Sequence, residues 1–236
     1  MKNLLLICSL LLVPGHAYLT AQEAPRFTHA MFVEGKRSMQ NLIEFPDFEQ
    51  DIEVRVTCTG HATAKGRLRD ARCSAPNDPE LTFTMAVSRR FNSTRVIPAT
   101  VNGKKEEVDF QFVVIFRKEG EIKSHEIYLH NLKNVDRLGL DYIGAQRYSI
   151  HPWPVRCGDF TLNDLLMEVA VVNEKGTVGD FDILSANFGL SEICREGFST
   201  HLKSGRWIPA LVDGKFVESV WANPRINSSV PYKRQQ

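Results

Sequence analysis

Apolar positions recur at every second residue in two segments that lie far apart in the chain. Val54, Val56 and Cys58 alternate with polar residues in the first segment, and Val169 and Val171 alternate in the second. Successive side chains of a β-strand point to opposite faces, so a two-residue period predicts a strand with one buried face. We therefore expect a half-buried strand in each segment, with these five residues facing a core.

A glycine turn and a returning strand follow each of these strands. The turns contain Lys65-Gly66 and Lys175-Gly176, and each predicts an antiparallel hairpin. The residues expected to face inward on the returning strands are Ala71, Cys73, Phe181 and Ile183. Leu68 and Val178 are one residue out of phase with them, which predicts a β-bulge at the same place in both hairpins.

A helix and a short repeated motif come next in both segments. Helical spacing predicts helices at about 79–91 and 190–204, the second with Ser191 as N-cap and Gly205 as its end. Ile-Pro-Ala then occurs at 97–99 and 208–210, and after two residues comes Asn-Gly-Lys or Asp-Gly-Lys. Proline disfavours helix at the preceding residue, and Asn/Asp-Gly favours a tight turn. The motif thus predicts the passage from the helix into a final strand.

The final strands differ in length. The first covers 106–116, and we expect it to turn at Glu119-Gly120 into a further strand over 121–130. The second covers 216–222, and we expect Pro224 to end it.

The same order of elements therefore occurs twice, which indicates a duplicated unit. Gly66 and Ile97 are 31 positions apart, and Gly176 and Ile208 are 32 positions apart. The predicted fold class is α+β: two tandem small domains, each a three-stranded antiparallel sheet packed on a helix. We place these domains at 36–130 and 150–226, with a linker at 131–149, partly helical, and a polar tail at 227–236.

The N-terminus has the pattern of a cleavable export signal. Met1-Lys2 precedes the apolar run "LLLICSLLLV", and small residues follow, which favours cleavage after Ala17, with Ala21 as second choice. The apolar run is shorter than the roughly 20 residues that cross a bilayer. We therefore expect a signal peptide at 1–17 and a periplasmic protein.

Composition argues against nucleic acid as a partner. The chain has 29 Lys and Arg against 28 Asp and Glu, a formal net charge of +1, and no basic cluster interleaved with aromatic residues. We expect contact with a membrane only through a protein partner.

Four cysteines remain once the predicted signal is removed: Cys58, Cys73, Cys157 and Cys194. An even number in an exported chain indicates disulfides. A two-residue loop at Lys65-Gly66 sets Cys58 opposite Cys73, which leaves Cys157 to pair with Cys194. Four buried free thiols are the alternative.

The sequence offers little for catalysis. In "HEIYLH" the histidines His125 and His130 are five positions apart, whereas a helical zinc motif needs them one turn apart; on a strand they point to opposite faces. We expect no enzymatic activity, no bound metal and no cofactor. Trp153, Trp207 and Trp221 are predicted to pack in a core or a domain interface, with a partner anchor at Trp153 as the alternative.

The repeated unit resembles the C-terminal domain of TonB, the periplasmic energy transducer of Gram-negative bacteria. "EVAVVNEKGTVGDFDILSANFG" (168–189) resembles the paired strands of that family, and "EICREGFSTHLKSGRWIPALVDGK" (192–215) resembles its helix, aromatic-Pro-Ala segment and glycine turn. The first copy matches more loosely. Unlike TonB, the chain has a signal of the cleavable type and no Pro-rich spacer, so we expect a binding or adaptor role without energy transduction.

The resemblance implies binding by strand addition, because TonB-like domains pair with an extended segment of outer-membrane transporters. The candidate partner-binding edge is the third strand of the first copy, with Val108, Phe110, Phe112, Val114 and Phe116 on its apolar face. We expect an envelope protein as partner, and the resemblance points to an outer-membrane transporter. The alternatives are a self-associating structural envelope protein and an edge already covered by the second half.

Overall fold

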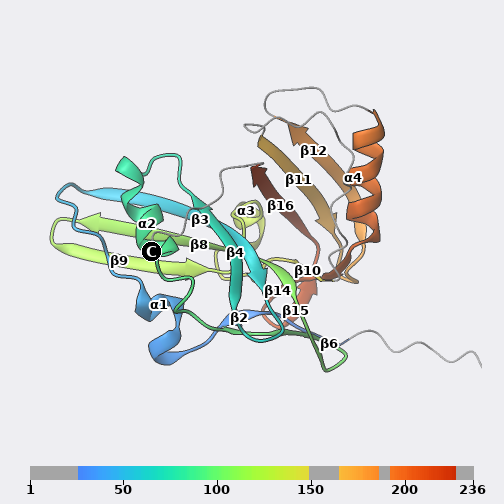
Figure 1. Ribbon diagram of the computed structural model, residues 1–236, viewed down its shortest axis with the longest axis horizontal. Coiled ribbons are helices and arrows are strands. Elements are labelled where there is room, and N and C mark those ends of the chain that lie inside the picture. The colour runs from blue at the N-terminus through green and yellow to red at the C-terminus, as the bar shows by residue number, and fades with distance from the viewer. Residues whose placement is uncertain (1–25, 149–164, 186–191, 227–236) are drawn as a thin grey trace, which may run out of the picture.

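The computed structural model describes residues 26–148, 165–185 and 192–226, and it is a mixed α+β chain built mainly from antiparallel sheets (Figure 1). The elements of the first half are β1 (Phe27–Thr28), β2 (Met31–Phe32), η1 (Gly35–Arg37), α1 (Met39–Leu42), β3 (Ile52–Ala62), β4 (Leu68–Ser74), η2 (Pro79–Leu81), α2 (Thr82–Ser88), β5 (Val96–Ile97), β6 (Ala99–Val101), β7 (Lys104–Glu106), β8 (Val108–Glu119), β9 (Ile122–Tyr128), α3 (Val135–Leu138) and β10 (Gln146–Tyr148). Those of the second half are β11 (Leu165–Val172), β12 (Val178–Ser185), α4 (Glu192–Ser204), β13 (Arg206–Ile208), β14 (Ala210–Val212), β15 (Lys215–Val217) and β16 (Ser219–Ile226). None of the described helices has the length and apolar character needed to cross a membrane.

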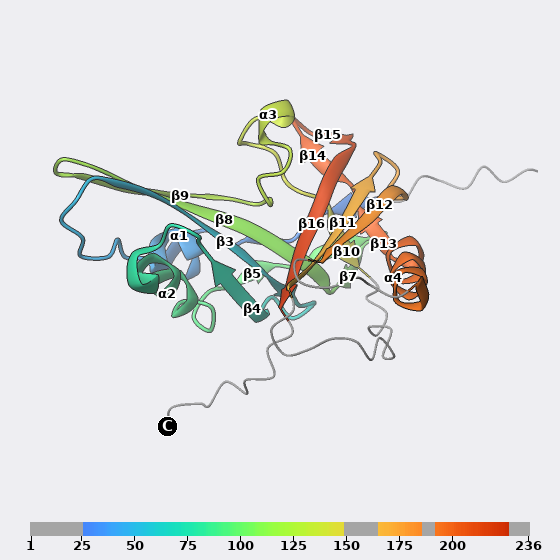
Figure 2. The same cartoon turned by 90° about the horizontal axis from the view of Figure 1, so that it is seen from above.

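The first half is organised around a six-stranded sheet with β8 at its centre. The strand order is β13-β10-β8-β3-β4, and β9 also pairs with β8. α1 and α2 lie on one side of this sheet (Figure 2). The core there is rich in phenylalanine: Phe83, Phe110 and Phe116 are fully buried among aliphatic residues that include Val54 and Val56. Burial of such rings is the main source of stability for this half.

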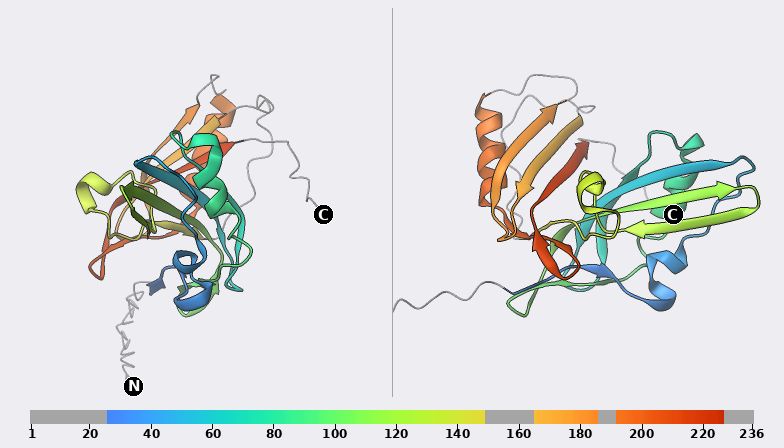
Figure 3. Two further views of the ribbon diagram at one scale, coloured as in Figure 1. Left: turned by 90° about the vertical axis from the view of Figure 1, so that its left-hand side faces the viewer. Right: turned by 180° about the vertical axis from the view of Figure 1, so that it is seen from behind.

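The second half contains a three-stranded sheet of order β12-β11-β16, with α4 packed on one face (Figure 3). Phe198 and Leu202 of α4 are fully buried against this sheet. The prediction that Val169 and Val171 face the core is wrong by one residue, because Ala170 and Val172 face α4 and the two valines are half-buried on the other side. The hydrophobic alternation predicted the wrong face because Glu168, a charged residue, is fully buried on the α4 face and interrupts the run of apolar residues there.

The two hairpins have the same loop and the same bulge. Thr63 donates its N–H to the Arg67 carbonyl (2.8 Å), and Asn173 donates to the Thr177 carbonyl (3.0 Å), so each loop holds three residues. The register then shifts by one residue in both hairpins, between Thr59 and His61 in β3 and between Ala170 and Val172 in β11. The predicted bulge at the same place in both hairpins is therefore confirmed.

The first hairpin carries a disulfide between Cys58 and Cys73, as predicted. The loop is three residues long, whereas two were predicted. This difference alone would shift the pairing of β3 with β4 by one residue. The bulge shifts it back, so Cys58 and Cys73 still lie opposite each other. The predicted pair of Cys157 and Cys194 depends on side chains outside the described residues, as do the signal peptide at 1–17 and Trp153.

The Ile-Pro-Ala motif supports the hairpin loop in both halves. Val96, which precedes Ile97, donates its N–H to the Gly66 carbonyl (3.2 Å). A Cβ added to Gly66 would lie 2.8 Å from the Val96 carbonyl oxygen, and one added to Gly176 would overlap the carbonyl oxygen of Trp207. Trp207 precedes the second Ile-Pro-Ala, so the two contacts are equivalent.

A second small hairpin follows the motif in each half. β6 pairs with β7 around Asn102-Gly103, and β14 pairs with β15 around Asp213-Gly214. All four turn residues have positive φ, between 47° and 79°. Positive φ at both central positions is the conformation of the tight turns that join antiparallel strands, which Asn/Asp-Gly favours.

Two predicted boundaries differ from those observed, and a third agrees. The first helix is shorter than 79–91, because Glu80 and Leu81 have left-handed φ values of 51° and 59° and α2 begins only at Thr82. The second helix, α4, covers Glu192–Ser204 and ends before Gly205 as predicted. β16 does not end at Pro224, which pairs with Met167, because an end strand tolerates a proline.

The segment predicted as a linker contains a strand that pairs with both halves. β10 lies within 131–149 and pairs with both β8 and β13, so a strand of the second half joins the sheet of the first.

Arg147 of β10 is 1% exposed and bonds Asp109 of β8 (2.8 Å) and His201 of α4 (2.8 Å). Its guanidinium also lies over the rings of Trp207 and Trp221, at 5.8 and 5.3 Å from the ring centres. Both tryptophans are thus core residues, as predicted.

Candidate functional site

The strand predicted as the partner-binding edge is not an edge. β8 pairs with β3 along 108–118 and with β9 along 113–119, and Val108 also pairs with Tyr148 of β10. The five predicted contact residues, Val108, Phe110, Phe112, Val114 and Phe116, are fully buried in the first core. The prediction is wrong because β9, which the sequence itself predicts, pairs on that side of β8 at 113–119 and β10 pairs there at Val108.

The corresponding third strand of the second half, β16, is closed by side chains. Asn134 accepts the Val220 N–H (2.8 Å) and donates to the Val220 carbonyl (2.8 Å), as a neighbouring strand would. Arg137 donates to the Glu218 carbonyl (2.6 Å), and Gln111 donates to the Ala222 carbonyl (2.7 Å). Three alternate carbonyls, those of Glu218 just before β16 and of Val220 and Ala222 within it, are therefore already bonded from outside the sheet.

β4 and β12 are the long end strands whose outer backbone accepts no bond from another element among the described residues. Each is the returning strand of its hairpin and ends its sheet. β9 also ends a sheet, but Gln40 of α1 donates its side-chain amide to the His125 carbonyl (2.9 Å), and the Gln40 backbone carbonyl is bonded to the His125 ring (2.9 Å). Open backbone on an end strand is the feature that strand addition requires.

β12 differs from β4 in having a groove beside it. α4 packs against β12 at the end of the molecule farthest from α2 (Figure 1), and the groove between them holds about 500 Å³. Its lining residues are Phe181, Asp182, Ile183, Glu192, Arg195, Glu196 and Ser199. Ile183 donates its N–H to the carboxylate of Asp182 (2.7 Å), a local bond that the carbonyl of an added strand can replace.

The groove is acidic with an apolar floor. Asp182, Glu192 and Glu196 line it together with Arg195, and all four residues are exposed. Phe181 and Ile183 supply apolar surface, and Lys203 lies over the Phe181 ring at 5.1 Å from its centre. An extended segment with Lys or Arg side chains matches this charge.

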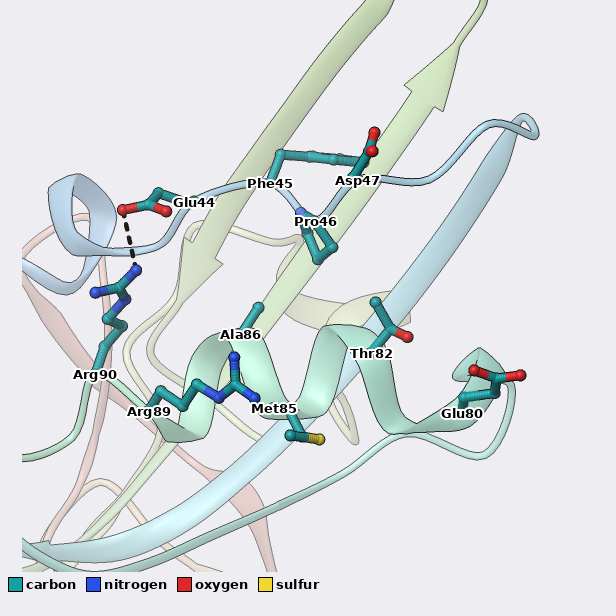
Figure 4. Close-up of a pocket in the computed structure, with 10 residues that line it drawn as sticks. All are labelled: Glu44, Phe45, Pro46, Asp47, Glu80, Thr82, Met85, Ala86, Arg89 and Arg90. Atoms are coloured by element: carbon teal, nitrogen blue, oxygen red, sulfur yellow. Dashed lines mark ion pairs between the residues drawn. The ribbon is translucent and has the colours of Figure 1, made fainter.

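A second groove of about 380 Å³ lies between the segment at 44–47 and α2 (Figure 4). Both signs of charge line it: Glu44, Asp47 and Glu80 against Arg89 and Arg90. Glu44 and Arg90 are already paired at 3.0 Å. The mixed charge selects no class of ligand, and no strand edge adjoins the groove in the described part of the chain.

The histidines of "HEIYLH" do not converge. His125 is bonded to Gln40, whereas His130 is fully buried and stacked on Tyr142, with 4.3 Å between ring centres. Burial lowers the pKa of His130. Among the described residues no group of three or more His, Cys, Asp or Glu side chains could hold a metal ion.

Ionisable groups do gather where the halves meet, around Arg147. His61 Nδ1 lies 3.1 Å from the Asp109 carboxylate, and this interaction raises the pKa of His61. His201 lies 4.0 Å from the buried Glu168. This chain of charges spans β3, β8, β10, α4 and β11, so its evident role is to hold the halves in one arrangement.

Comparison with known proteins adds no relative. No family model, no curated protein and no solved structure matches this chain. The site rests on its geometry alone.

Sequence reasoning missed the β12 edge although its signals were present. Asp180 and Asp182 alternate outward from the predicted strand, a pattern that is most simply a solvated strand face. These two carboxylates are exposed, as are Glu192 and Glu196 of α4. The predicted helix at 190–204 follows the predicted strand directly, so the sequence already placed the four acidic residues close together.

Proposed function

We propose that this chain is a protein-binding module that takes up an extended, basic segment of a partner by strand addition along β12. The observation that carries the proposal is the open outer side of β12 beside an acidic groove, in a molecule whose third strands are both occupied. Backbone hydrogen bonds supply affinity in this mode, and side-chain pockets supply specificity.

The chain is, in this proposal, a tandem pair of TonB C-terminal-like units at 36–130 and 150–226. The shared loop, bulge, glycine contact and final hairpin of the two halves support a duplicated unit. Strand addition at the second strand, in place of the third, is the departure from the mode that the resemblance implies.

The place of action we propose is the periplasm, with an envelope protein as partner. The export pattern at 1–17 supports this, and the Cys58–Cys73 bridge supports it independently, because disulfides persist in oxidising compartments. An outer-membrane transporter remains the partner that the resemblance favours.

Affinity capture from solubilised cell envelopes tests the proposal. The bait is the mature chain, compared with Asp182→Lys/Glu196→Lys in the groove and with Glu119→Lys/Glu121→Lys at the tip of the β8–β9 hairpin. Both variants change the net charge equally, and all four residues are exposed. We expect wild type and the hairpin variant to recover the same protein and the groove variant to lose it. Equal recovery by all three baits would remove β12 from the function.

A further inference from the structure

We infer that β12 of one copy pairs with β4 of a second copy, so that chains join head to tail. This inference rests on the strand-addition function proposed above and names one occupant of β12. The occupant is the basic edge of the first half, which is equivalent in structure to β12 and opposite to it in charge.

Equivalent geometry makes the two edges compatible. Ala71 and Cys73 of β4 pack toward the first core, on the side of α2, and Phe181 and Ile183 of β12 pack toward the second core, on the side of α4. Strand alternation therefore directs the intervening residues away from the helix of each half, although the Asp182 carboxylate accepts the Ile183 N–H and so also lines the groove. If β4 and β12 pair antiparallel with their helices on the same side, Arg72 and Asp182 project from one common face.

Charge then decides which edges pair. The first hairpin, 63–74, carries Lys65, Arg67, Arg69 and Arg72 against Asp70, a net charge of +3. The second, 173–185, carries Lys175 against Glu174, Asp180 and Asp182, a net charge of −2. On the strands themselves Arg69, Arg72, Asp180 and Asp182 are all exposed. Opposite charges on neighbouring strands stabilise a pair, and like charges destabilise it.

Symmetric pairing is disfavoured for the same reason. Two β12 strands side by side would bring carboxylates together, and two β4 strands would bring guanidinium groups together. The complementary junction joins different surfaces of the two copies, and such a junction leaves one free β4 and one free β12 at the ends. The expected product is an open chain of copies whose length grows with concentration.

Charge reversal tests the junction. One variant, Arg69→Glu/Arg72→Glu, makes β4 acidic, and the other, Asp180→Lys/Asp182→Lys, makes β12 basic. By sedimentation velocity over a micromolar concentration series we expect wild type to associate and each variant alone to associate about tenfold more weakly. An equal mixture of the two variants has complementary junctions again, and we expect it to associate like wild type. Recovery in the mixture also shows that both variants are folded.

Two results would overturn the inference. One is wild type that stays monomeric across the series, and the other is a mixture that associates no better than its components. Envelope capture separates this failure from that of the proposed function. A protein recovered through β12 by a monomeric wild type would leave strand addition standing and exclude a second copy as the occupant.

Discussion

The carbonyl oxygen of Trp207 faces Gly176 so closely that no side chain fits between them, and Val96 stands in the same relation to Gly66. Each contact joins a hairpin loop to the residue before an Ile-Pro-Ala motif. The contact explains why the motif and the glycine recur together, since each half needs both to fix its hairpin against its final strands.

Alanine at Gly176 is the direct test of this contact. Gly176 has φ +76°, a conformation that costs an L-residue about 1–2 kcal/mol, and the new Cβ also overlaps the Trp207 carbonyl. We expect Gly176→Ala to lower the free energy of unfolding by about 3 kcal/mol in denaturant titrations. Gly214→Ala is the matched control, because Gly214 also has φ +76° but has no atom within 4 Å of the added Cβ. Equal losses in the two variants would show that the contact contributes nothing.

The disulfide should stabilise the first half measurably. Cys58 and Cys73 are separated by 15 positions, and closing a loop of that length stabilises a fold by about 3 kcal/mol. We expect Cys58→Ala/Cys73→Ala to unfold at lower denaturant concentration than oxidised wild type by that amount. Peptide mapping of unreduced protein should show the Cys58–Cys73 link and also tests the predicted Cys157–Cys194 link. Unchanged stability in the variant would mean that the bond is not formed in solution.

Asn134 should be needed to close the β16 edge. It is 3% exposed, and its amide is bonded to both the N–H and the carbonyl of Val220. Asn134→Ala leaves both backbone groups without this partner, which costs about 2–3 kcal/mol in the free energy of unfolding. Asn131→Ala is the comparison variant, since Asn131 reaches Val220 only at 3.4 Å. Faster hydrogen exchange at Val220 is expected in Asn134→Ala alone, and exchange unchanged from wild type would contradict the assignment.

Acid should weaken the fold through His130. Its Nδ1 accepts the Leu132 N–H (3.1 Å), and its Nε2 donates to the Leu140 carbonyl (2.9 Å), so the ring is held neutral and its pKa is lowered by burial. A lowered histidine pKa gives stability that is complete above the unfolded value of about 6.5 and is lost as pH falls below it.

The variant His130→Phe keeps the ring stacked on Tyr142 but removes the titration. Urea titrations at about pH 7.5 and pH 5 should show a smaller acid loss of the free energy of unfolding in this variant than in wild type. Tyr128→Phe, on the other side of the stack, serves as the control and should keep the wild-type pH response. A His130→Phe response as steep as that of wild type would assign the acid sensitivity to other groups. His61 acts in the opposite direction, because its pKa is raised by Asp109 and its contribution is lost as pH rises.

Local signals in the sequence predicted the local structure well. The glycine turns, the bulges beside Leu68 and Val178, and the Cys58–Cys73 pair all follow from short-range spacing, which neighbouring residues determine. The α4 boundary likewise followed from Gly205, a residue suited to ending a helix.

Contacts between distant segments could not be read in the same way. Nothing near Asn134 indicates that its amide closes β16, because the partner, Val220, is 86 positions away. Glu168 and Arg147 are charged, and charged residues are seldom fully buried, yet both are buried where the halves meet. The prediction that β8 is an edge strand was wrong for the same reason, because a strand's place in a sheet depends on distant strands that pair with it.

Site-specific photo-crosslinking in cells tests the central claim most directly. A photoreactive residue replaces Leu184, which lies on β12 and is 51% exposed, or Ile122, which lies on β9 and is 73% exposed. If β12 accepts an added strand, Leu184 gives a protein adduct whose crosslinked peptide is extended and carries Lys or Arg, and Ile122 gives none. Adducts from Ile122 without any from Leu184 would contradict strand addition at β12.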